Sequence, residues 1–518
     1  MSLPYESRSL WIATTPETSY AALAGDLDVD VAIVGAGLTG LVAAWLLTEA
    51  GEQVAVLEQG RIVSGETGNT TAHVTELVDT RYHVIEHDFG REGARLVARS
   101  NHEAIDWIDR TSSALGIACS FERVPAYLYT ERAGDMGFLR KEFAAAERAG
   151  VPVELVDYVP LPFPTAGALR VARQAQFHPR DFLLPLADRI AARGGRIFEM
   201  TRMTGVTDGE PCEVETSNGT VRARDVIVAA NVPANNWAAL ITKLPAYRTY
   251  AIAARGGSTI PRGLYWDTDD PYHYTRTQPS AEGEVLIIGG EDHKTGTETE
   301  TLRHFEALLD YARSRFDVEH VDYRWSGQII EPVDGLPYIG LNTASDHVYV
   351  ATGYSGNGMT FATVAGQLTS DLVLGRPNPY ADVYRATRVK PLAAAKDFIT
   401  ENIDFPKYLV RDRTTNADVQ GDNPALLAKG TGKLMAIDGV KYAVYRAEDG
   451  QLHSLSPICP HMHCDVAWNN AERSWDCPCH GSRFTPTGDV LNGPAVTNMV
   501  PLRLPETNHD DSQAKRGS

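Results

Sequence analysis

The chain has 518 residues, 43% of them hydrophobic, and a formal net charge of −19 at pH 7. This length suggests two to four domains. The charge argues against nucleic-acid binding, which needs a basic footprint, and no apolar run reaches the roughly 18 residues of a membrane span.

Cysteine usage and the N-terminal residues predict a cytoplasmic protein. The first 20 residues lack the basic-then-apolar pattern of a signal peptide. Only Cys119 and Cys212 lie outside a cluster of four cysteines near the C-terminus. Two scattered cysteines do not make a disulfide scaffold, so a reducing compartment is expected.

The first motif is a glycine-rich turn between a strand and a helix. Residues 1–28 are expected to form an irregular arm, and Asp30–Val34 an apolar strand. The turn that follows places glycines at three spaced positions, Gly35, Gly37 and Gly40. These glycines allow a tight turn, close approach of a pyrophosphate, and packing of the helix on the strand. The helix N-terminus attracts phosphates.

A second strand, Gln53–Glu58, completes this dinucleotide-binding pattern. Glu58 can accept hydrogen bonds from both ribose hydroxyls, which disfavours NADP. A polar loop at residues 61–73 suits a second pass along a long pyrophosphate. A second glycine motif for another nucleotide is absent, so the pattern predicts one bound dinucleotide, FAD.

The middle of the chain alternates helical and strand patterns. Residues 85–150 have a helical pattern, and Asn218-Gly219 predicts a hairpin turn. Residues 240–330 are expected to form a sheet with one helix. The strand Val348–Thr352 then leads into a second glycine-rich turn, 353–360, whose helix N-terminus can face a flavin ring.

Residues from about 29 to 390 resemble the FAD-dependent D-amino-acid oxidase, glycine oxidase and sarcosine oxidase superfamily. The resemblance is carried by the first glycine turn with Glu58, the loop at 65–72, and the pieces Gln176–Asp181, Glu199–Met203, Asp334–Gly340 and Thr352–Thr360. It implies an α/β, Rossmann-like FAD-binding domain (segments about 29–85, 170–240 and 330–390) with an inserted antiparallel-sheet substrate domain of α+β type (about 86–169 and 241–329).

The expected FAD-binding residues follow these motifs. They are Gly35, Gly37, Leu38, Thr39, Gly40, Glu58, Gln59, Arg61, Thr67, Gly68, Thr70, Thr71, Met203, Ala230, Gly353, Gly356, Asn357, Gly358, Met359 and Thr360. No cysteine lies between Cys212 and Cys459, which excludes the cysteine-linked flavin of some relatives. His73 is one residue out of register with a histidine attachment site, so non-covalent FAD is expected.

Catalytic residues are less well specified. By position in the family pattern, the candidates near the flavin are Tyr272, His273, Tyr274, Arg276, Glu291, His293, Lys294 and Tyr354. The residues expected to act in catalysis are Arg276, Lys294, His293, Tyr274 and Tyr354. Arg276 is expected to clamp a substrate carboxylate, or else to be a structural arginine. Lys294 is expected over the flavin, and the alternatives for Lys294 and His293 are likewise structural.

The C-terminal region holds two short loops with one cysteine and one histidine each. Cys459 and His461 form the first pair, and Cys477 and His480 the second. This split suits a Rieske [2Fe–2S] centre, while zinc bound by two cysteines and two histidines is the alternative. Cys464 and Cys479 remain, one in each loop, which argues against zinc.

Residues 423–505 resemble the disulfide-containing Rieske family, an all-β domain. The resemblance implies that Cys459, His461, Cys477 and His480 are the cluster ligands, that Cys464 and Cys479 form a disulfide, and that a proline loop near Pro494 covers the cluster. Residues 391–422 are expected to be a linker, and 506–518 a disordered tail. Ser482 can donate to a cluster sulfur. Phe484 replaces a tyrosine of high-potential relatives, so an intermediate potential is expected.

Together these domains predict an electron relay. The chain is expected to be an FAD-dependent dehydrogenase that oxidises a C–N bond of an amine or amino acid. Electrons would pass singly through the cluster to an external acceptor, a protein or a quinone. A non-catalytic or sensor-type electron-transfer protein and an oxygen-using FAD oxidase are the alternatives. The oligomeric state is not predicted.

Overall fold

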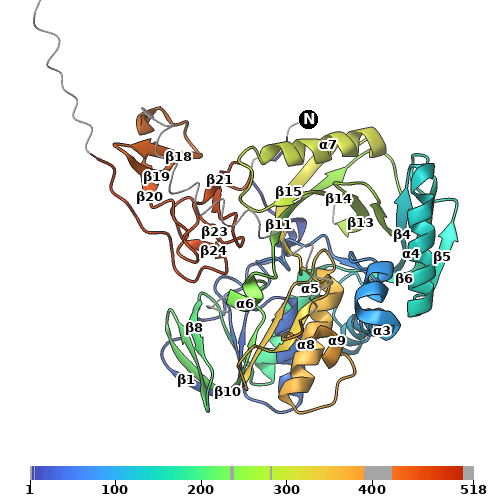
Figure 1. Cartoon of the computed structure of the whole chain (residues 1–518), viewed down its shortest axis with the longest axis horizontal. Coiled ribbons are helices and arrows are strands. Elements are labelled where there is room, and N and C mark those ends of the chain that lie inside the picture. Colours follow the sequence, from blue (N-terminus) through green and yellow to red (C-terminus); the bar gives the residue numbers. More distant parts are fainter. Residues whose placement is uncertain (1–2, 5, 234–237, 281–282, 390–422, 506–518) are drawn as a thin grey trace, which may run out of the picture.

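The computed structural model describes residues 3–4, 6–233, 238–280, 283–389 and 423–505 (Figure 1). The linker expected at 391–422 and the tail expected at 506–518 lie outside the described residues. Among the described helices, none is both long and apolar enough to cross a membrane.

The first sheet is built around parallel strands. In β1, residues Val31–Val34 are an unbroken buried apolar run, as expected for a strand covered on both faces. The sheet has the spatial order β16 (Tyr338–Leu341), β17 (Val348–Thr352), β10 (Gly219–Val228), β1 (Leu27–Val34), β2 (Val54–Leu57) and β7 (Arg196–Phe198), with β9 (Cys212–Thr216) paired to β10 and to β8 (Met203–Thr207).

Helices α2 (Leu38–Glu49), α5 (Pro179–Ala192) and α8 (Gly358–Val373) pack around this sheet. Helix α2 lies close against α8, because a Cβ on Gly366 would approach the Val42 Cβ to 2.7 Å. The glycine in α8 therefore allows this helix pair to pack tightly behind the glycine-rich turn.

The second sheet is mostly antiparallel and has nine strands. Its spatial order is β15 (His320–Ile330), β11 (Ala246–Arg255), β14 (Gly283–Lys294), β13 (His273–Ser280), β12 (Leu264–Asp267), β4 (Glu122–Thr130), β6 (Gly167–Gln176) and β3 (His73–Val74), with β5 (Val153–Val156) paired to β6. Helix α7 (Leu302–Phe316) packs on β11 and β14, and α4 (Met136–Ala149) on β5 and β6 (Figure 1).

The C-terminal part is a separate pair of small antiparallel sheets. One contains β18 (Thr431–Ile437), β19 (Val440–Arg446) and β20 (Leu452–Leu455); the other contains β21 (Ala467–Asn469), β22 (Ser474–Asp476), β23 (Arg483–Phe484) and β24 (Val490–Asn492). The described residues also form two short 3-10 helices, η1 (Ala133–Asp135) and η2 (Pro424–Leu426), and the short helices α6 (Ala238–Ile241) and α9 (Ala381–Tyr384).

The N-terminal residues differ from the expected irregular arm. Helix α1 (Leu10–Thr14) forms there, and Trp11 is fully buried. Its indole Nε1 donates to the Thr70 carbonyl at 2.5 Å, and the Ser9 hydroxyl donates to the Gly68 carbonyl at 2.5 Å. These residues fold because the loop at 61–73 supplies backbone acceptors for them, a long-range contact without a local sequence signal.

The helical pattern at 85–150 is also interrupted. Helix α3 (Tyr82–Leu115), with a non-helical residue at Gly90, is followed by strand β4 before α4 begins. Strand β4 is held by neighbours distant in sequence, β6 and β12. Such tertiary pairing overrides a local helical pattern.

Candidate active site

A large cavity opens where the two sheets meet. It encloses about 1950 Å³, a figure that includes the solvent-filled space of its open mouth. Its wall combines the first glycine turn, the loop at 63–79, the N-terminus of α8, and residues from β11, β13 and β15. It also includes Asn492, Gly493, Ala495 and Val496 of the C-terminal part. The cavity is therefore long enough to cross from one part of the protein to the other.

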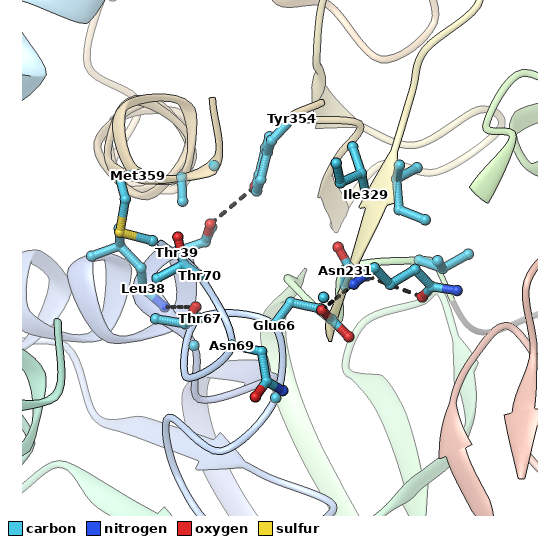
Figure 2. A pocket seen from close by; sticks show the side chains of 18 of the residues that line it. Leu38, Thr39, Glu66, Thr67, Asn69, Thr70, Asn231, Ile329, Tyr354 and Met359 are labelled. Atoms are coloured by element: carbon cyan, nitrogen blue, oxygen red, sulfur yellow. Dashed lines mark hydrogen bonds between the residues drawn. The ribbon is translucent and has the colours of Figure 1, made fainter. Parts of the chain in front are cut away.

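The first glycine turn has no room for side chains. A Cβ on Gly35, whose φ is +100°, would lie 2.5 Å from the Ala229 carbonyl oxygen, and a Cβ on Gly40 would overlap the Gly35 carbonyl. A Cβ on Gly37 would lie 2.9 Å from the Thr67 hydroxyl. The turn thus leaves a cradle in front of the α2 N-terminus, and Leu38 N donates to the same Thr67 hydroxyl at 3.1 Å (Figure 2).

Glu58 closes one end of this cradle. Its two carboxylate oxygens accept from Ala36 N at 3.0 Å and Gly60 N at 2.9 Å. Burial raises the pKa of Glu58, and the backbone hydrogen bonds act in the opposite direction. This placement leaves the carboxylate at the cavity wall, where a ligand hydroxyl can reach it.

The second glycine turn borders the cavity from the other side. The Tyr354 hydroxyl hydrogen-bonds the Thr39 hydroxyl at 3.0 Å, which links the two turns (Figure 2). The Asn357 side chain accepts from Asp79 N at 2.7 Å and donates to the Leu77 carbonyl at 3.2 Å. These bonds position the N-terminus of α8 at the cavity.

In the C-terminal part, two loops bring the Cys and His side chains together. Cys459 and Cys477 are buried free thiols, and the rings of His461 and His480 lie 5.1 Å apart. A disulfide joins Cys464 to Cys479, one from each loop. Backbone bonds from Cys459 N to the Cys464 carbonyl and from Cys477 N to the Ser482 carbonyl, both 2.8 Å, shape the loops. Two thiols and two imidazoles between loops joined by a disulfide fit the ligand set of a Rieske [2Fe–2S] centre.

Comparison with known proteins agrees with this geometry. Residues 30–372 match the family model of the FAD dependent oxidoreductases. The chain belongs to that family. Residues 415–505 match the Rieske [2Fe-2S] domain. This FAD-dependent oxidoreductase therefore binds FAD in its first part and a [2Fe–2S] cluster in its Rieske domain, and the predicted fold class is confirmed.

Relatives share one or both parts of this oxidoreductase. The putative Rieske 2Fe-2S iron-sulfur protein YhfW of Bacillus subtilis is 34% identical over 497 residues, covering 95% of this chain and 97% of the relative. Gamma-glutamylputrescine oxidoreductase of Escherichia coli is 27% identical, covering 67% of this chain and 84% of the relative. The crystal structure of glycine oxidase from Geobacillus kaustophilus is similar with a TM-score of 0.59 and 19% identity, covering 70% of this chain and 99% of that one.

Most of the residues expected to bind FAD line the cavity. Those that do so are Gly35, Gly37, Leu38, Thr39, Glu58, Gln59, Thr67, Thr70, Thr71, Met203, Ala230, Gly356, Asn357, Gly358 and Met359. The cavity wall does not include Gly40, Arg61, Gly68, Gly353 or Thr360. Arg61 instead pairs with the buried Glu199 carboxylate at 2.8 Å, and Gly40 packs against the turn.

The expected substrate clamp is not at the cavity. Arg276 is fully buried, and its guanidinium donates to the carbonyls of Ala72 at 2.7 Å and Phe177 at 3.4 Å and to the Gln278 side chain. Burial lowers the pKa of Arg276 to about 9. It holds backbone behind the cavity wall, which corrects the expectation that it binds a substrate carboxylate.

His293 and Lys294 also lie away from the described cavity wall. The His293 ring lies nearly parallel to the rings of Tyr250 and His304, at centroid distances of 5.7 Å and 4.6 Å. Lys294 lies at the end of β14 on the side of the Rieske domain; burial, His461 and then the charge of Lys294 lower the pKa of His480 to about 4. The catalytic expectations for His293 and Lys294 are corrected accordingly, whereas Tyr274 and Tyr354 do line the cavity.

Sequence reasoning missed several polar residues of the same wall. Asp79 and Thr249 line the cavity, together with Trp266. Asp292 is outside the wall, and burial raises its pKa to about 7, while the hydroxyls of the wall residues Thr249 and Tyr272 act in the opposite direction. Asp79 lies in an irregular loop and Asp292 at the irregular end of a strand, so neither follows a motif that could have marked it.

Proposed function

We propose that this oxidoreductase oxidises a carbon–nitrogen bond of a small amine or amino acid at the FAD cavity. Electrons then leave singly through the Rieske cluster to an external acceptor, a protein or a quinone. The substrate class is supported by relatives named for glycine oxidation and gamma-glutamylputrescine oxidation. FAD supplies two-electron oxidation and a Rieske cluster supplies one-electron transfer.

The single observation that carries the relay is that one side chain touches both sites. Gln328 on β15 lines the FAD cavity. Its Nε2 donates at 2.7 Å to the carbonyl of Gly481, the residue after His480. The cluster loop therefore lies against the wall of the FAD cavity, with one residue between them.

Further contacts fix this arrangement. The Asn492 amide of the Rieske domain donates to Glu66 at 2.9 Å, and the backbone N of Gln328 also donates to Glu66. Arg202 donates to Asn498 at 3.0 Å and to the Val490 carbonyl at 3.2 Å. Elsewhere, the Thr301 hydroxyl donates to the Asn469 side chain at 2.6 Å. These bonds hold the two domains in one orientation.

Residue roles follow from the geometry. We propose that Cys459, His461, Cys477 and His480 hold the cluster, because two thiols and two imidazoles meet between loops that a disulfide joins. The Ser482 hydroxyl accepts from Ala495 N at 3.1 Å and lies within hydrogen-bond reach of the Cys459 sulfur. It can therefore donate its proton to a ligand sulfur. Outside these loops, Cys119 and Cys212 are free thiols, which supports a reducing, cytoplasmic setting.

The test is an anaerobic titration with amines and amino acids, in which flavin and cluster absorbance are followed together. We expect the flavin to bleach first and the cluster to follow. A His461→Ala variant should retain flavin bleaching but take up one electron fewer per chain. If no amine or amino acid bleaches the flavin, the proposed reaction is wrong. If the variant reoxidises in oxygen as fast as the parent, the oxidase alternative is favoured.

A further inference from the structure

A β-bulge lies in the wall of the FAD cavity. In the pairing of β11 with β14, Arg248 faces His293 and Tyr250 faces Gly290, so Glu291 and Asp292 together face the single residue Thr249. Glu291 has a φ of +59°, which is unusual for a residue with a side chain. Bulges re-aim side chains and are common beside active sites. This one turns Asp292 toward the hydroxyls of the cavity wall.

Asp292 is a carboxylate without a cationic partner among the described residues. One of its oxygens, Oδ1, is buried and has no hydrogen-bond partner there. Its other contacts are with the hydroxyls of Thr249 and Tyr272, and the charged groups that act on it, Asp79 and Glu291, are also acidic. Buried carboxylates are normally paired, because removing an unpaired charge from water is costly.

A second carboxylate, that of Asp79, lies near the Tyr272 hydroxyl at the cavity wall. Asp79 lines the cavity and accepts from Gly356 N at 2.6 Å. A Cβ on Gly356 would touch the Asp79 carboxylate and would lie 3.4 Å from the Tyr272 hydroxyl, so these two groups flank one point. Burial raises the pKa of Asp79, and Arg81, outside the cavity wall, partly opposes this.

Aromatic rings complete the wall beside these acids. Tyr272 and Tyr274 have ring centroids 5.7 Å apart, and His73 lies edge-on to Tyr274 at 5.5 Å and to Trp266 at 6.0 Å. All four rings line the cavity. Aromatic faces attract cations, and cages of such rings bind ammonium groups. Acids and aromatic faces together are therefore suited to a positively charged nitrogen.

The cavity wall has few cationic groups that could bind a substrate carboxylate. In the part of its wall that the structure describes there is no lysine, and Arg202 is the one arginine. Arg202 is engaged with the Rieske domain through Asn498. Burial and the charge of Arg276 lower the pKa of His73 to about 3, so that this ring is neutral. Arg276 itself is bound to backbone carbonyls.

We propose that Asp79 and the rings of Trp266, Tyr272 and Tyr274 form a cage for an alkylammonium group, with the charge of Asp292 acting from behind the wall, so that the substrate is a cationic amine without an α-carboxylate. This substrate class rests on the proposed C–N oxidation. A cation in the cage supplies the positive charge that Asp79 and the nearby Asp292 lack, and the cage therefore selects amines over amino acids.

The cage is tested by binding alone, with probes that cannot react. Tetramethylammonium has no lone pair and forms no imine, and acetate is the anionic counterpart. Each is titrated anaerobically into the FAD-loaded enzyme while the flavin absorbance is followed. We expect tetramethylammonium to bind at least tenfold more tightly than acetate. Asp79→Asn and Asp292→Asn should each weaken tetramethylammonium binding at least tenfold, because the amide keeps the shape and removes the charge.

Asp310→Asn is the matched control, since the Asp310 side chain is 80% exposed on α7 and lies outside the cavity wall. The affinity of this variant for tetramethylammonium should equal that of the parent. Tighter binding of acetate, or unchanged affinity in both cage variants, would overturn the proposal. The comparison of probes on the parent enzyme decides the point even if one variant fails to fold.

Substrate screening separates this inference from the proposed function. n-Butylamine, 1,4-diaminobutane, glycine and D-alanine are offered to the same holoenzyme. Flavin bleaching by the amines and not by the amino acids supports the cage. Bleaching by the amino acids alone overturns the cage and leaves C–N oxidation standing. If no compound bleaches the flavin while tetramethylammonium binds, the proposed reaction fails and the cation site remains.

Discussion

Two carboxylates at the cavity differ in how their oxygens are satisfied. Glu58 accepts a backbone N–H on each oxygen, an arrangement prepared for a neutral hydroxyl ligand. Asp292 has one oxygen without a partner in the described structure, and burial raises its pKa to about 7. The same chemical group can therefore act as a fixed acceptor in one place and as a titrating counter-ion in the other.

The pKa of Asp292 makes cation binding depend on pH. At pH 6 this carboxyl is mostly neutral, and at pH 8 mostly ionised, so tetramethylammonium should bind several-fold more tightly at pH 8. The probe has a fixed charge, so titration of the probe cannot contribute. Asp292→Asn should flatten the profile, and a profile that is unchanged in this variant would contradict the assignment.

The raised pKa of Asp292 also makes the stability of the fold depend on pH. An Asp in the unfolded chain ionises near pH 3.9, below the raised folded value of about 7. The contribution of Asp292 to stability is therefore fully present at low pH and is lost as pH rises through about 7. In the cation-free protein, thermal unfolding of Asp292→Asn should become less sensitive to pH between 6 and 8 than unfolding of the parent.

Gly40 permits a substitution test of the first turn. A Cβ there would overlap the Gly35 carbonyl, and overpacking of this kind typically costs about 1–3 kcal/mol. We expect Gly40→Ala to purify with little FAD and with a lowered melting temperature. Gly137→Ala is the control, because nothing lies within 4 Å of its Cβ position in helix α4. A normal flavin content in Gly40→Ala would show that the turn can rearrange to accept the methyl group.

At the scale of elements, strand β15 has two roles. Along β11 it is part of the substrate-side sheet, and at Gln328 it contacts the loop that carries His480. A Cβ on Gly481 would collide with the Ala246 Cβ and lie 2.7 Å from Gln328 Nε2. The glycine after the histidine thus lets the cluster loop approach the sheet closely.

Gln328→Leu tests this contact, since it removes the hydrogen bond and keeps the approximate volume. A hydrogen bond of this kind contributes about 0.5–1.5 kcal/mol, so electron arrival at the cluster should slow by up to about tenfold relative to flavin bleaching. Stopped-flow absorbance measures both steps in one experiment. Gln451→Leu, at an exposed turn of the Rieske domain, should leave their ratio unchanged; an equal effect of both changes would argue against the contact.

At the scale of the whole molecule, two domains of unequal size depend on different kinds of stabilisation. The FAD-binding part has large continuous cores. The Rieske domain has two small cores, one of which includes its cysteines. The disulfide between Cys464 and Cys479 closes a 15-residue separation, for which loop entropy predicts about 3 kcal/mol.

Replacing both disulfide cysteines with serine should therefore lower the stability of the Rieske domain alone. We expect loss of iron and of cluster absorbance, with FAD content preserved, measured by metal analysis and visible spectra. Cys212→Ser, in the FAD-binding part, is the control and should keep its iron. Loss of FAD in the disulfide variant would show that the two parts fold as one unit.

Local motifs made much of this molecule predictable. The glycine turn with Glu58 and the paired Cys/His loops are short, contiguous patterns, each tied to one backbone geometry. Helix α1 and strand β4 were not predicted, because the residues that they contact are remote in sequence. Arg276 was expected at the substrate because a sequence does not show which side of a wall a side chain faces. Asp292 depends on a bulge, which has no sequence signature of its own.

The part of the wall that the Rieske domain forms with Asn492, Gly493, Ala495 and Val496 also has a consequence for biosynthesis. Because the docked Rieske domain closes part of the FAD cavity, a bound flavin is covered by a domain that leaves the ribosome after the FAD-binding part. We expect FAD to load before docking and to exchange slowly afterwards, so that the order of maturation follows the order of the chain. The finished enzyme would then keep its first cofactor for as long as its second domain stays in place.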